Sequence, residues 1–460
     1  MEGKPIWLTE DLALHPQLRG RQQAEAVVVG GGLSGVTTAY MLAREGMHVV
    51  LLEADRLGRG ASGHSMGKVT VQHGLIYSRL KEQWGMEVTQ AYAFCQSRAL
   101  KAMASLAIEL EIPCGWNTTD ASLYAQTAQE ERLLEKEEAA AQKAGLSMSL
   151  MPASSVPMQA RSILTVSGQA SFDPFAYLHS LTSALLILGS RIYEQSRVQS
   201  ISTQGVYTDT GSVHAPFVII ATHFPIINFP GWYFLRARQI RSHVVALSDA
   251  PALEGMYQHV NIGGISVVRR DGLLLMGALA YPTGQETSID HDTVLLKKAH
   301  SLYPNARPYA FWHGQDVMST DGLPFIGPYS QRTPNHFVAA GFSNWGMTNS
   351  MAAAQAISSR ILGQLLPEAE IFDPSRTMKY SASKMMSTFL KTTGIHISGI
   401  KRKQAPTCTH MGCKLRYNPS TASWDCPCHG SRFDSIGRIL NGPAVHQAAI
   451  TNKNRLGQSK

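Results

Sequence analysis

Two short apolar runs near the start of the chain indicate its architecture. They are Ala26–Val29 and Val49–Leu52, and both consist of aliphatic residues rich in valine. Continuous runs of this kind are typical of strands buried on both faces of a parallel sheet. The segment between them, roughly Leu33–Arg44, is predicted to be a helix, and Gly46 is suited to end it. The pattern therefore predicts a strand–helix–strand unit.

Later apolar segments predict further elements. Strands are expected at Arg191–Tyr193, Phe217–Ala221 and Phe337–Ala340, with a helix from near Thr348 through an alanine-rich stretch to Leu362. Ile395–Ile400 is a candidate for one more strand. No apolar run approaches the roughly 18 residues that a membrane-spanning helix needs.

Three glycines follow the first predicted strand in a GxGxxG pattern. Gly30 allows a tight turn, Gly32 lets the backbone approach a pyrophosphate, and Gly35 lets the helix pack closely on the strand. The N-terminal amides of that helix would point at the phosphates. Glu53, at the end of the second strand, is placed to accept hydrogen bonds from a ribose. These features predict a dinucleotide site but do not distinguish NAD from FAD.

Segments further along the chain decide between these cofactors. A glycine-rich stretch, residues 59–70, follows the ribose acid, a DGxPxIG segment begins at Asp321, and a GFxxxGM turn begins at Gly341. Together, over residues 24–365, they resemble the D-amino-acid oxidase type of FAD-dependent oxidoreductase. The resemblance implies FAD as cofactor. The alternative is a Rossmann-like fold without flavin.

The resemblance also implies which residues contact FAD. In that family the late turn opens a helix whose N-terminus faces the pyrimidine end of the flavin, where its dipole stabilises negative charge on the reduced ring. The implied contacts lie in the glycine motif, the ribose acid, the glycine-rich stretch, an adenine-side position and the late turn: Gly30, Gly32, Leu33, Ser34, Gly35, Glu53, Ser62, Val198, Gly341, Gly346, Met347 and Thr348.

A Cys/His motif lies near the end of the chain. It reads CTHMGC at residues 408–413 and CPCHGS at residues 426–431. Two thiolates and two imidazoles from paired loops are what a [2Fe–2S] centre needs when one iron keeps sulfur ligands and the other takes nitrogen. Cys and His at such spacings also bind zinc.

This motif resembles the cluster signature of the Rieske iron–sulfur family. The resemblance implies that Cys408 and Cys426 hold one iron and that His410 and His429 hold the other. The two remaining cysteines, Cys413 and Cys428, match the disulfide that joins the cluster loops in many Rieske domains. About thirty residues separate the expected end of the FAD fold from Cys408. The sheet that usually precedes the first cluster loop is therefore expected to be shortened or deleted.

Two residues beside the motif bear on the reduction potential. Ser431 has a hydroxyl that can donate to a cluster sulfur, whereas Phe433 stands where high-potential Rieske proteins have Tyr. Because donors to cluster sulfur favour the reduced form, we expect a potential below that of respiratory Rieske proteins.

Three residues are candidates for catalysis. The segment from Lys68 to Gly74 resembles a signature of bacterial flavoproteins with a C-terminal Rieske module, and its Lys68 and His73 are candidates for a base or for an electrostatic partner of reduced flavin. Glycine-oxidase-like members hold the substrate carboxylate with an Arg shortly before the DGxPxIG segment. Asp316 stands there instead, which counts against an α-amino acid and favours a cationic amine; the alternative is a loop cap.

Charge is unevenly distributed along the chain. The net charge is +8, and from Ile371 onward fourteen Lys and Arg oppose three Asp. Such a basic segment is suited to an acidic electron carrier such as a ferredoxin or flavodoxin, although a merely solvated basic surface is the alternative. No nucleic-acid motif is recognisable. Of six cysteines, four lie in the cluster motif, and the N-terminus lacks the apolar core of a secretory signal, so a cytoplasmic location is expected.

The sequence therefore predicts an α/β protein with a Rossmann-like FAD-binding domain, an inserted antiparallel-sheet substrate domain and a small all-β Rieske-like module. The expected division is residues 1–380, with FAD-binding parts at about 24–80, 150–230 and 310–370, and residues 395–460. The predicted function is electron transfer between a small C–N or C–O substrate, FAD and a [2Fe–2S] cluster, and then an external carrier. The alternatives are a plain FAD oxidase with a vestigial or zinc-binding module and a non-catalytic redox sensor.

Overall fold

The fold was derived from a computed structural model that describes residues 3–8, 13–153, 158–285, 290–376, 382–400 and 405–451. Its strands form four sheets, of six, four, nine and four strands. None of the helices in this part of the chain combines the length and the hydrophobicity that spanning a bilayer requires.

The six-stranded sheet contains the predicted strand–helix–strand unit. Its order is β18-β19-β12-β2-β3-β8, with bounds Phe325–Ser330, Thr333–Ala340, Phe217–His223, Ala26–Val29, Val49–Leu52 and Arg191–Tyr193. All neighbours are parallel except β18 and β19. The five strands predicted from the sequence are confirmed, although β12 and β19 are longer than expected.

Both faces of this sheet are covered, which explains the continuous apolar runs. Val28 and Leu51 pack into a core with four helices on one face: α1 (Leu33–Arg44), α3 (Met86–Glu109), α5 (Pro174–Ile187) and α8 (Gly346–Ile361). Val27 and Leu52 point to the other face and pack against a four-stranded sheet. That sheet comprises β1 (Gly20–Gln23), β11 (Gly211–His214), β10 (Gly205–Thr208) and β9 (Val198–Ser202).

The nine-stranded sheet corresponds to the predicted antiparallel insertion, but its strands at residues 68–69 and 162–171 lie within the expected FAD-binding parts, 24–80 and 150–230. Its strands, in order, are β17 (Arg307–Ser319), β13 (Ala237–Ser248), β16 (Leu273–Pro282), β15 (Ser266–Arg270), β14 (Met256–His259), β5 (Asn117–Ala125), β7 (Ser162–Ser171) and β4 (Lys68–Val69), and β6 (Ser149–Pro152) also pairs with β7. Only β5 and β14 are parallel neighbours within it. Accompanying helices are α2 (Ile76–Trp84), α4 (Ala128–Lys143), α6 (Tyr233–Arg236) and α7 (His291–Leu302).

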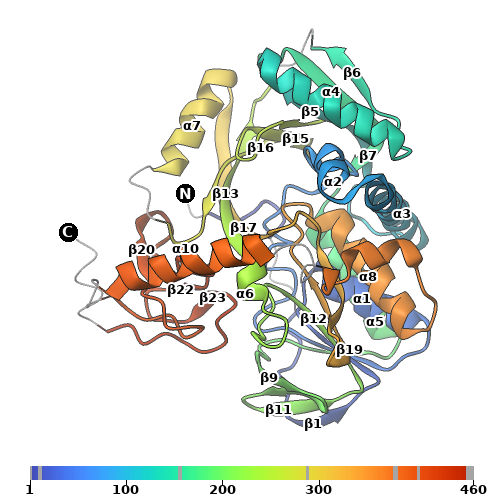
Figure 1. Cartoon of the computed structure of the whole chain (residues 1–460), viewed down its shortest axis with the longest axis vertical. Coiled ribbons are helices and arrows are strands. Elements are labelled where there is room, and N and C mark those ends of the chain that lie inside the picture. Colours follow the sequence, from blue (N-terminus) through green and yellow to red (C-terminus); the bar gives the residue numbers. More distant parts are fainter. Residues whose placement is uncertain are drawn as a thin grey trace.

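The C-terminal module is a small antiparallel sheet with the cluster loops at its edge. Its order is β20-β21-β22-β23, with bounds Arg416–Asn418, Ser423–Asp425, Arg432–Phe433 and Ile439–Asn441, and it also contains a short 3-10 helix, η2 (Pro419–Thr421). Another 3-10 helix, η1 (Pro367–Phe372), precedes the module and packs on α3 and β18. Figure 1 shows this module in red, on the opposite side of the molecule from α1, α5 and α8. Within the described part of the module, no named strand precedes the first cluster loop, in agreement with the expected shortening.

The predicted strand at Ile395–Ile400 is wrong, because this segment belongs to helix α10 (Ala382–Ile400). The alternation of isoleucines fits a strand locally, but the contacts of the segment follow a helical spacing. His396 meets Cys413, and a Cβ placed on Gly399 would lie 3.3 Å from the Cβ of Lys414. Residues three apart lie on one face of a helix, so this face of α10 packs on the first cluster loop.

Candidate functional site

A cavity of about 460 Å³ connects the glycine motif to the C-terminal module. Its lining includes Gly30, Gly32 and the acid Glu53, together with residues of β13, β16 and β17. Residues 439–442 of the C-terminal module also line it. A cavity of this size, with the glycine motif in its wall, suits a dinucleotide and a small substrate.

The glycine motif has the close approaches that the pattern predicts. Gly30 has a φ of +114°, and a Cβ on it would overlap the carbonyl oxygen of Ala221. A Cβ on Gly35 would overlap the carbonyl oxygen of Gly30, so only glycine lets α1 begin this close to β2. Gly32 is open toward the cavity and has Ser62 as its nearest neighbour. These positions fit a pyrophosphate at the N-terminus of α1.

Backbone hydrogen bonds hold the side chain of Glu53, the predicted ribose acid. Glu53 Oε2 accepts a hydrogen bond from the amide of Gly31 at 2.7 Å, and Oε1 accepts one from the amide of Asp55 at 2.8 Å. Burial raises the pKa of the Glu53 carboxyl, while these bonds and nearby Arg197 oppose the rise. Ser62 Oγ accepts a hydrogen bond from Leu33 N at 2.9 Å.

The late turn borders the same cavity. Gly341, Gly346 and Met347 line it, as do Ser34 and Val198 among the other predicted FAD contacts. Helix α8 begins at Gly346, two residues before its expected start, and its N-terminus faces the cavity. Thr348 is not in the lining. Its hydroxyl lies 3.3 Å from the carbonyl oxygen of Thr70 and 3.0 Å from His73 Nε2, and these contacts hold the late turn in position.

The structure does not support His73 as a catalytic base. Its ring is buried outside the cavity lining and stacks on Trp345 at 4.8 Å between centroids. Nδ1 lies 2.6 Å from the Tyr92 hydroxyl and Nε2 lies 2.8 Å from the carbonyl oxygen of Thr70. Burial lowers the pKa of His73 to about 3. With both nitrogens engaged, His73 fixes the base of the late turn.

Lys68, the other candidate from that segment, does line the cavity. Its ammonium donates to Gln258 Oε1 at 3.2 Å and to Ser266 Oγ, and it lies 5.8 Å from the centre of the Trp345 ring. Burial lowers the pKa of Lys68 to about 7 because the charged form loses its hydration. Lys68 therefore changes charge near neutral pH inside the cavity.

This titration gives a testable dependence of the flavin potential on pH. A cationic Lys68 stabilises negative charge on reduced flavin, and that contribution is present below pH 7 and lost as the pH rises through about 7. We expect Lys68→Met to lower the FAD midpoint potential below pH 7 by at least about 30 mV, the two-electron equivalent of about 1.4 kcal/mol. Dye-coupled potentiometry at several pH values measures this. Equal potentials for the two proteins throughout would contradict the assignment.

Asp316 also lines the cavity, on β17. Its Oδ1 accepts a hydrogen bond from Val317 N at 2.6 Å. Burial raises the pKa of this carboxyl, and His223, whose ring lies close enough to interact electrostatically, opposes the rise. His223 is itself in the lining and has a φ of +67°. His223 could not be selected from the sequence, because an isolated His at the end of a strand belongs to no motif.

The four residues implied as cluster ligands lie together at one edge of the C-terminal sheet. The Cys408 and Cys426 side chains are hydrogen-bonded to each other, and the His410 and His429 rings are 4.9 Å apart between centroids. Burial lowers the pKa of both histidines, so both imidazoles are neutral at neutral pH.

The polar atoms of this group fit a bound cluster. His410 Nδ1 and both ring nitrogens of His429 are buried, with no hydrogen-bond partner among the described residues. The two thiols are buried, and neither is in a disulfide. Two neutral imidazoles with free nitrogens beside two unbridged thiols are the donor set of a [2Fe–2S] centre, which would satisfy these buried atoms.

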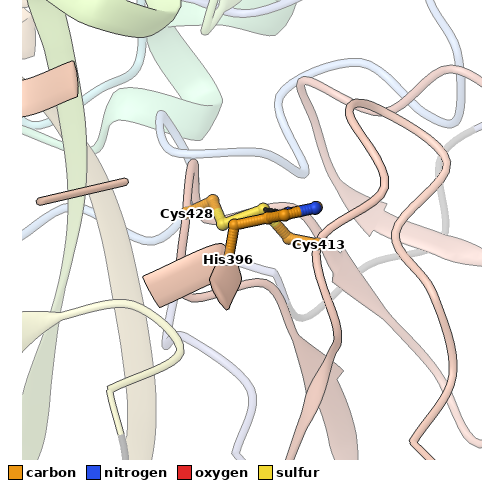
Figure 2. A group of neighbouring side chains, drawn as sticks. All are labelled: His396, Cys413 and Cys428. Carbon is orange, nitrogen blue, oxygen red and sulfur yellow. Dashed lines mark hydrogen bonds between the residues drawn. A yellow bond between two sulfur atoms is a disulfide. The ribbon is translucent and has the colours of Figure 1, made fainter. Parts of the chain in front are cut away.

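A disulfide joins the two loops behind this group. Cys413 and Cys428 are bonded, as the Rieske resemblance implied. Figure 2 shows His396 of α10 against this bridge, with its Nδ1 3.5 Å from Cys413 Sγ. The three side chains are close enough to suggest a metal site, but the bridged sulfurs are not thiolates and so cannot serve as strong ligands. Helix α10 therefore covers the bridge.

Ser431 and Phe433 provide a test of how the potential is set. The Ser431 hydroxyl is hydrogen-bonded to the Cys408 sulfur, whereas Phe433, fully buried on β22, has no such donor. A hydrogen bond is worth about 1 kcal/mol, or about 40 mV for a one-electron couple. We therefore expect Ser431→Ala to lower the cluster potential and Phe433→Tyr to raise it, each by roughly that amount, in redox titrations followed by EPR. No change in either variant would contradict this account.

The C-terminal module is docked on the nine-stranded sheet through buried polar contacts. Gln239 donates to the carbonyl oxygen of His429 at 2.7 Å, and Gln315 donates to that of Gly430 at 2.9 Å. Arg241 and Asp425, each 1% exposed, form an ion pair at 3.5 Å. These partners anchor the loop that carries the second Cys–His pair.

The imidazole edge of the module faces the FAD fold. His410 Nε2 lies 2.6 Å from Asn228 Oδ1, and the His429 ring lies against Phe234 at 5.7 Å between centroids. The sequence did not indicate that Asn228, Gln239 or Gln315 would contact the C-terminal module. They belong to no motif, and their partners are about 110 to 200 residues away in the chain.

Comparisons with known proteins agree with this arrangement. The family model for FAD dependent oxidoreductases matches residues 25–360, and the model for the Rieske [2Fe-2S] domain matches residues 400–452. The chain therefore belongs to the family of FAD-dependent oxidoreductases, of the D-amino-acid oxidase type, and carries a C-terminal Rieske domain. Its cofactors are FAD and a [2Fe–2S] cluster.

Individual relatives share one or both parts. A putative Rieske 2Fe-2S iron-sulfur protein, YhfW of Bacillus subtilis (strain 168), is 30% identical over 95% of this chain and 96% of its own length. Gamma-glutamylputrescine oxidoreductase of Escherichia coli (strain K12) is 25% identical over 76% of this chain and 85% of its length. The crystal structure of glycine oxidase from Geobacillus kaustophilus superposes with a TM-score of 0.64 at 21% identity, covering 75% of this chain and 96% of that protein.

Proposed function

We propose that this oxidoreductase oxidises a small amine and passes the electrons through FAD and the Rieske cluster to an external carrier. The observation that carries the proposal is the shared cavity, whose walls come from both the glycine motif and the Rieske module. When bound, FAD takes two electrons from a C–H bond next to nitrogen, and the cluster carries one electron at a time. A protein whose Rieske module borders the same cavity as the glycine motif is suited to join these two kinds of transfer.

The residues assigned to the two cofactors follow from the contacts above. Gly30, Gly32, Glu53 and Ser62 would hold the nucleotide part of FAD, and the N-terminus of α8 would face its ring. Four residues would hold the cluster: Cys408, His410, Cys426 and His429. We propose a division into residues 1–380 and 395–460, with helix α10 (Ala382–Ile400) running across the start of the second part.

The cavity favours a cationic substrate over an α-amino acid. Its arginines among the described residues are Arg56, Arg59 and Arg197, all in segments near the ribose acid. Among the described lining residues, no arginine lies on β13, β16 or β17 to hold a carboxylate bidentately, and Asp316 on β17 places a carboxyl group there instead. The similarity to gamma-glutamylputrescine oxidoreductase, named for an amine, agrees with this substrate class.

The basic C-terminal segment supports an acidic protein as the external carrier. Arg438 is exposed on the module, and Lys414 and Arg416 are partly exposed. A ferredoxin or flavodoxin has the complementary charge. We also propose a cytoplasmic location, since Cys95 and Cys114 are both free and buried.

The substrate class is tested by anaerobic reduction with a panel of primary and secondary amines. We expect at least one amine to bleach the flavin and then to reduce the cluster, and glycine to do neither. Asp316→Asn should lower kcat/KM for that amine by roughly 10- to 100-fold, because an ion-paired hydrogen bond is worth about 1.5–3 kcal/mol. The matched control is Asp271→Asn, an exposed carboxylate. Equal losses in both variants, or reduction by glycine, would contradict the proposal.

A further inference from the structure

Three potential metal ligands meet outside the cavity and the cluster site. His243 lies on β13, His313 lies directly opposite it on β17, and Asp292 is in the first turn of α7. None of the three lines the cavity. Figure 1 shows α7 running alongside β13, and the two elements are in contact. The group therefore joins a helix to a strand pair at the side of the nine-stranded sheet.

The distances within the group are close to those of a coordination site. Asp292 Oδ1 lies 2.5 Å from His243 Nδ1 and 3.1 Å from His313 Nε2. One ligand atom from each residue lies within 4.8 Å of the other two. Zn–N and Zn–O distances of about 2.0–2.2 Å place neighbouring ligand atoms of a tetrahedral site roughly 3.3–3.5 Å apart. Only small side-chain movements separate the observed group from such a geometry.

Two neighbouring histidines are buried beside Asp292. His243 is 1% exposed and faces Asp292 with Nδ1, while its opposite nitrogen, Nε2, has no hydrogen-bond partner within the described ranges. The His291 ring lies 5.3 Å from that of His243 and stacks on Tyr281. Both His291 nitrogens are buried and also lack a partner among the residues described. His291 is thus a nearby fourth donor.

The donor types also suit a metal ion. Imidazole nitrogen and carboxylate oxygen bind divalent transition metals when the imidazole is neutral and the carboxylate is ionised.

We propose that His243, Asp292 and His313 bind one divalent first-row transition-metal ion, for which Zn²⁺ is the probe. Two imidazoles and a carboxylate are a ligand set that Zn²⁺ and its neighbours accept. The ion would fasten α7 to β13 and β17. The inference is independent of the proposed amine substrate.

The test uses the full-length protein loaded with FAD and cluster. Samples with two irons per chain are selected, because zinc could otherwise enter an empty cluster site. They are equilibrated with Zn²⁺ and dialysed, and the zinc and all other first-row metals are quantified by mass spectrometry. The variants are Asp292→Asn and His313→Gln, and the matched control is His300→Gln, an exposed histidine on the same helix.

We expect one zinc per chain in the wild type and in His300→Gln, with affinity at least tenfold lower in the two ligand variants. Substitutions of residues that hydrogen-bond to metal ligands lower metal affinity by about 10- to 100-fold, and loss of a ligand itself should cost at least as much. Bound flavin and the two irons, checked on each sample, show that the variants are folded. If purified wild type instead holds a third iron that both variants lose, the site is supported with iron as occupant. No extra metal in the wild type, or metal retained in both variants, would overturn the proposal.

Discussion

Replacing Cys408 with Ser should remove the iron–sulfur cluster and leave FAD in place. The Cys408 sulfur is buried in the module, next to that of Cys426 and the Ser431 hydroxyl. A serine oxygen at this position is a much poorer ligand for iron than a thiolate. Iron should fall from two atoms per chain to nearly none, while the FAD content stays at one because the glycine motif is untouched.

The matched control is Cys95→Ser, a buried free cysteine on α3 outside the motif. It should keep both irons. Peroxide formation distinguishes the proposed electron-transfer chain from a plain FAD oxidase. A plain oxidase would form as much peroxide in Cys408→Ser as in the wild type. Amine-driven reduction of an external one-electron acceptor should be lost in Cys408→Ser. If that variant retains both irons, or transfers electrons to the acceptor as fast as the wild type, the cluster assignment is wrong.

Adding a methyl group at Gly35 should prevent FAD from binding. The added carbon would overlap the carbonyl oxygen of Gly30, which forces α1 away from β2. Such overpacking costs about 1–3 kcal/mol of folding free energy, and it also displaces the helix amides that would face the pyrophosphate. We expect Gly35→Ala to be purified with at least about tenfold less FAD, measured by absorbance after denaturation.

Two further variants separate loss of FAD from loss of fold. Gly32→Ala places its methyl group in the cavity, with Ser62 Oγ at 3.3 Å as the nearest contact, so it should weaken FAD binding while the fold persists. Gly394→Ala, on α10, meets nothing within 4 Å and should bind FAD normally. Full FAD occupancy in Gly35→Ala and Gly32→Ala would contradict the assigned nucleotide site.

The sequence was most informative where local patterns fix the structure. The strand, glycine and helix order at residues 26–52 predicted β2, α1 and β3 with their observed bounds. This worked because parallel strands buried on both faces require continuous apolar runs and because the close approaches at Gly30 and Gly35 admit only glycine. The disulfide between Cys413 and Cys428 was likewise implied by motif resemblance.

The sequence was least informative where distant segments meet. The helical contacts of α10 depend on Cys413 and Lys414, so the isoleucine alternation at residues 395–400 was misleading. His73 has chemistry suited to catalysis, but the hydroxyl of Tyr92 and the backbone of Thr70 occupy its nitrogens. Docking of the module through Gln239 and Gln315 depends on side chains that no local pattern distinguishes.

The central claim is that one chain holds both a flavin and a histidine-ligated [2Fe–2S] cluster. Low-temperature EPR of the dithionite-reduced protein, with iron and FAD quantified on the same sample, tests it most directly. The account predicts two irons and one FAD per chain and a rhombic signal with the low average g value of a cluster that has imidazole ligands on one iron. Stoichiometric flavin without iron or signal, or zinc in place of iron at the cluster cysteines, would contradict it.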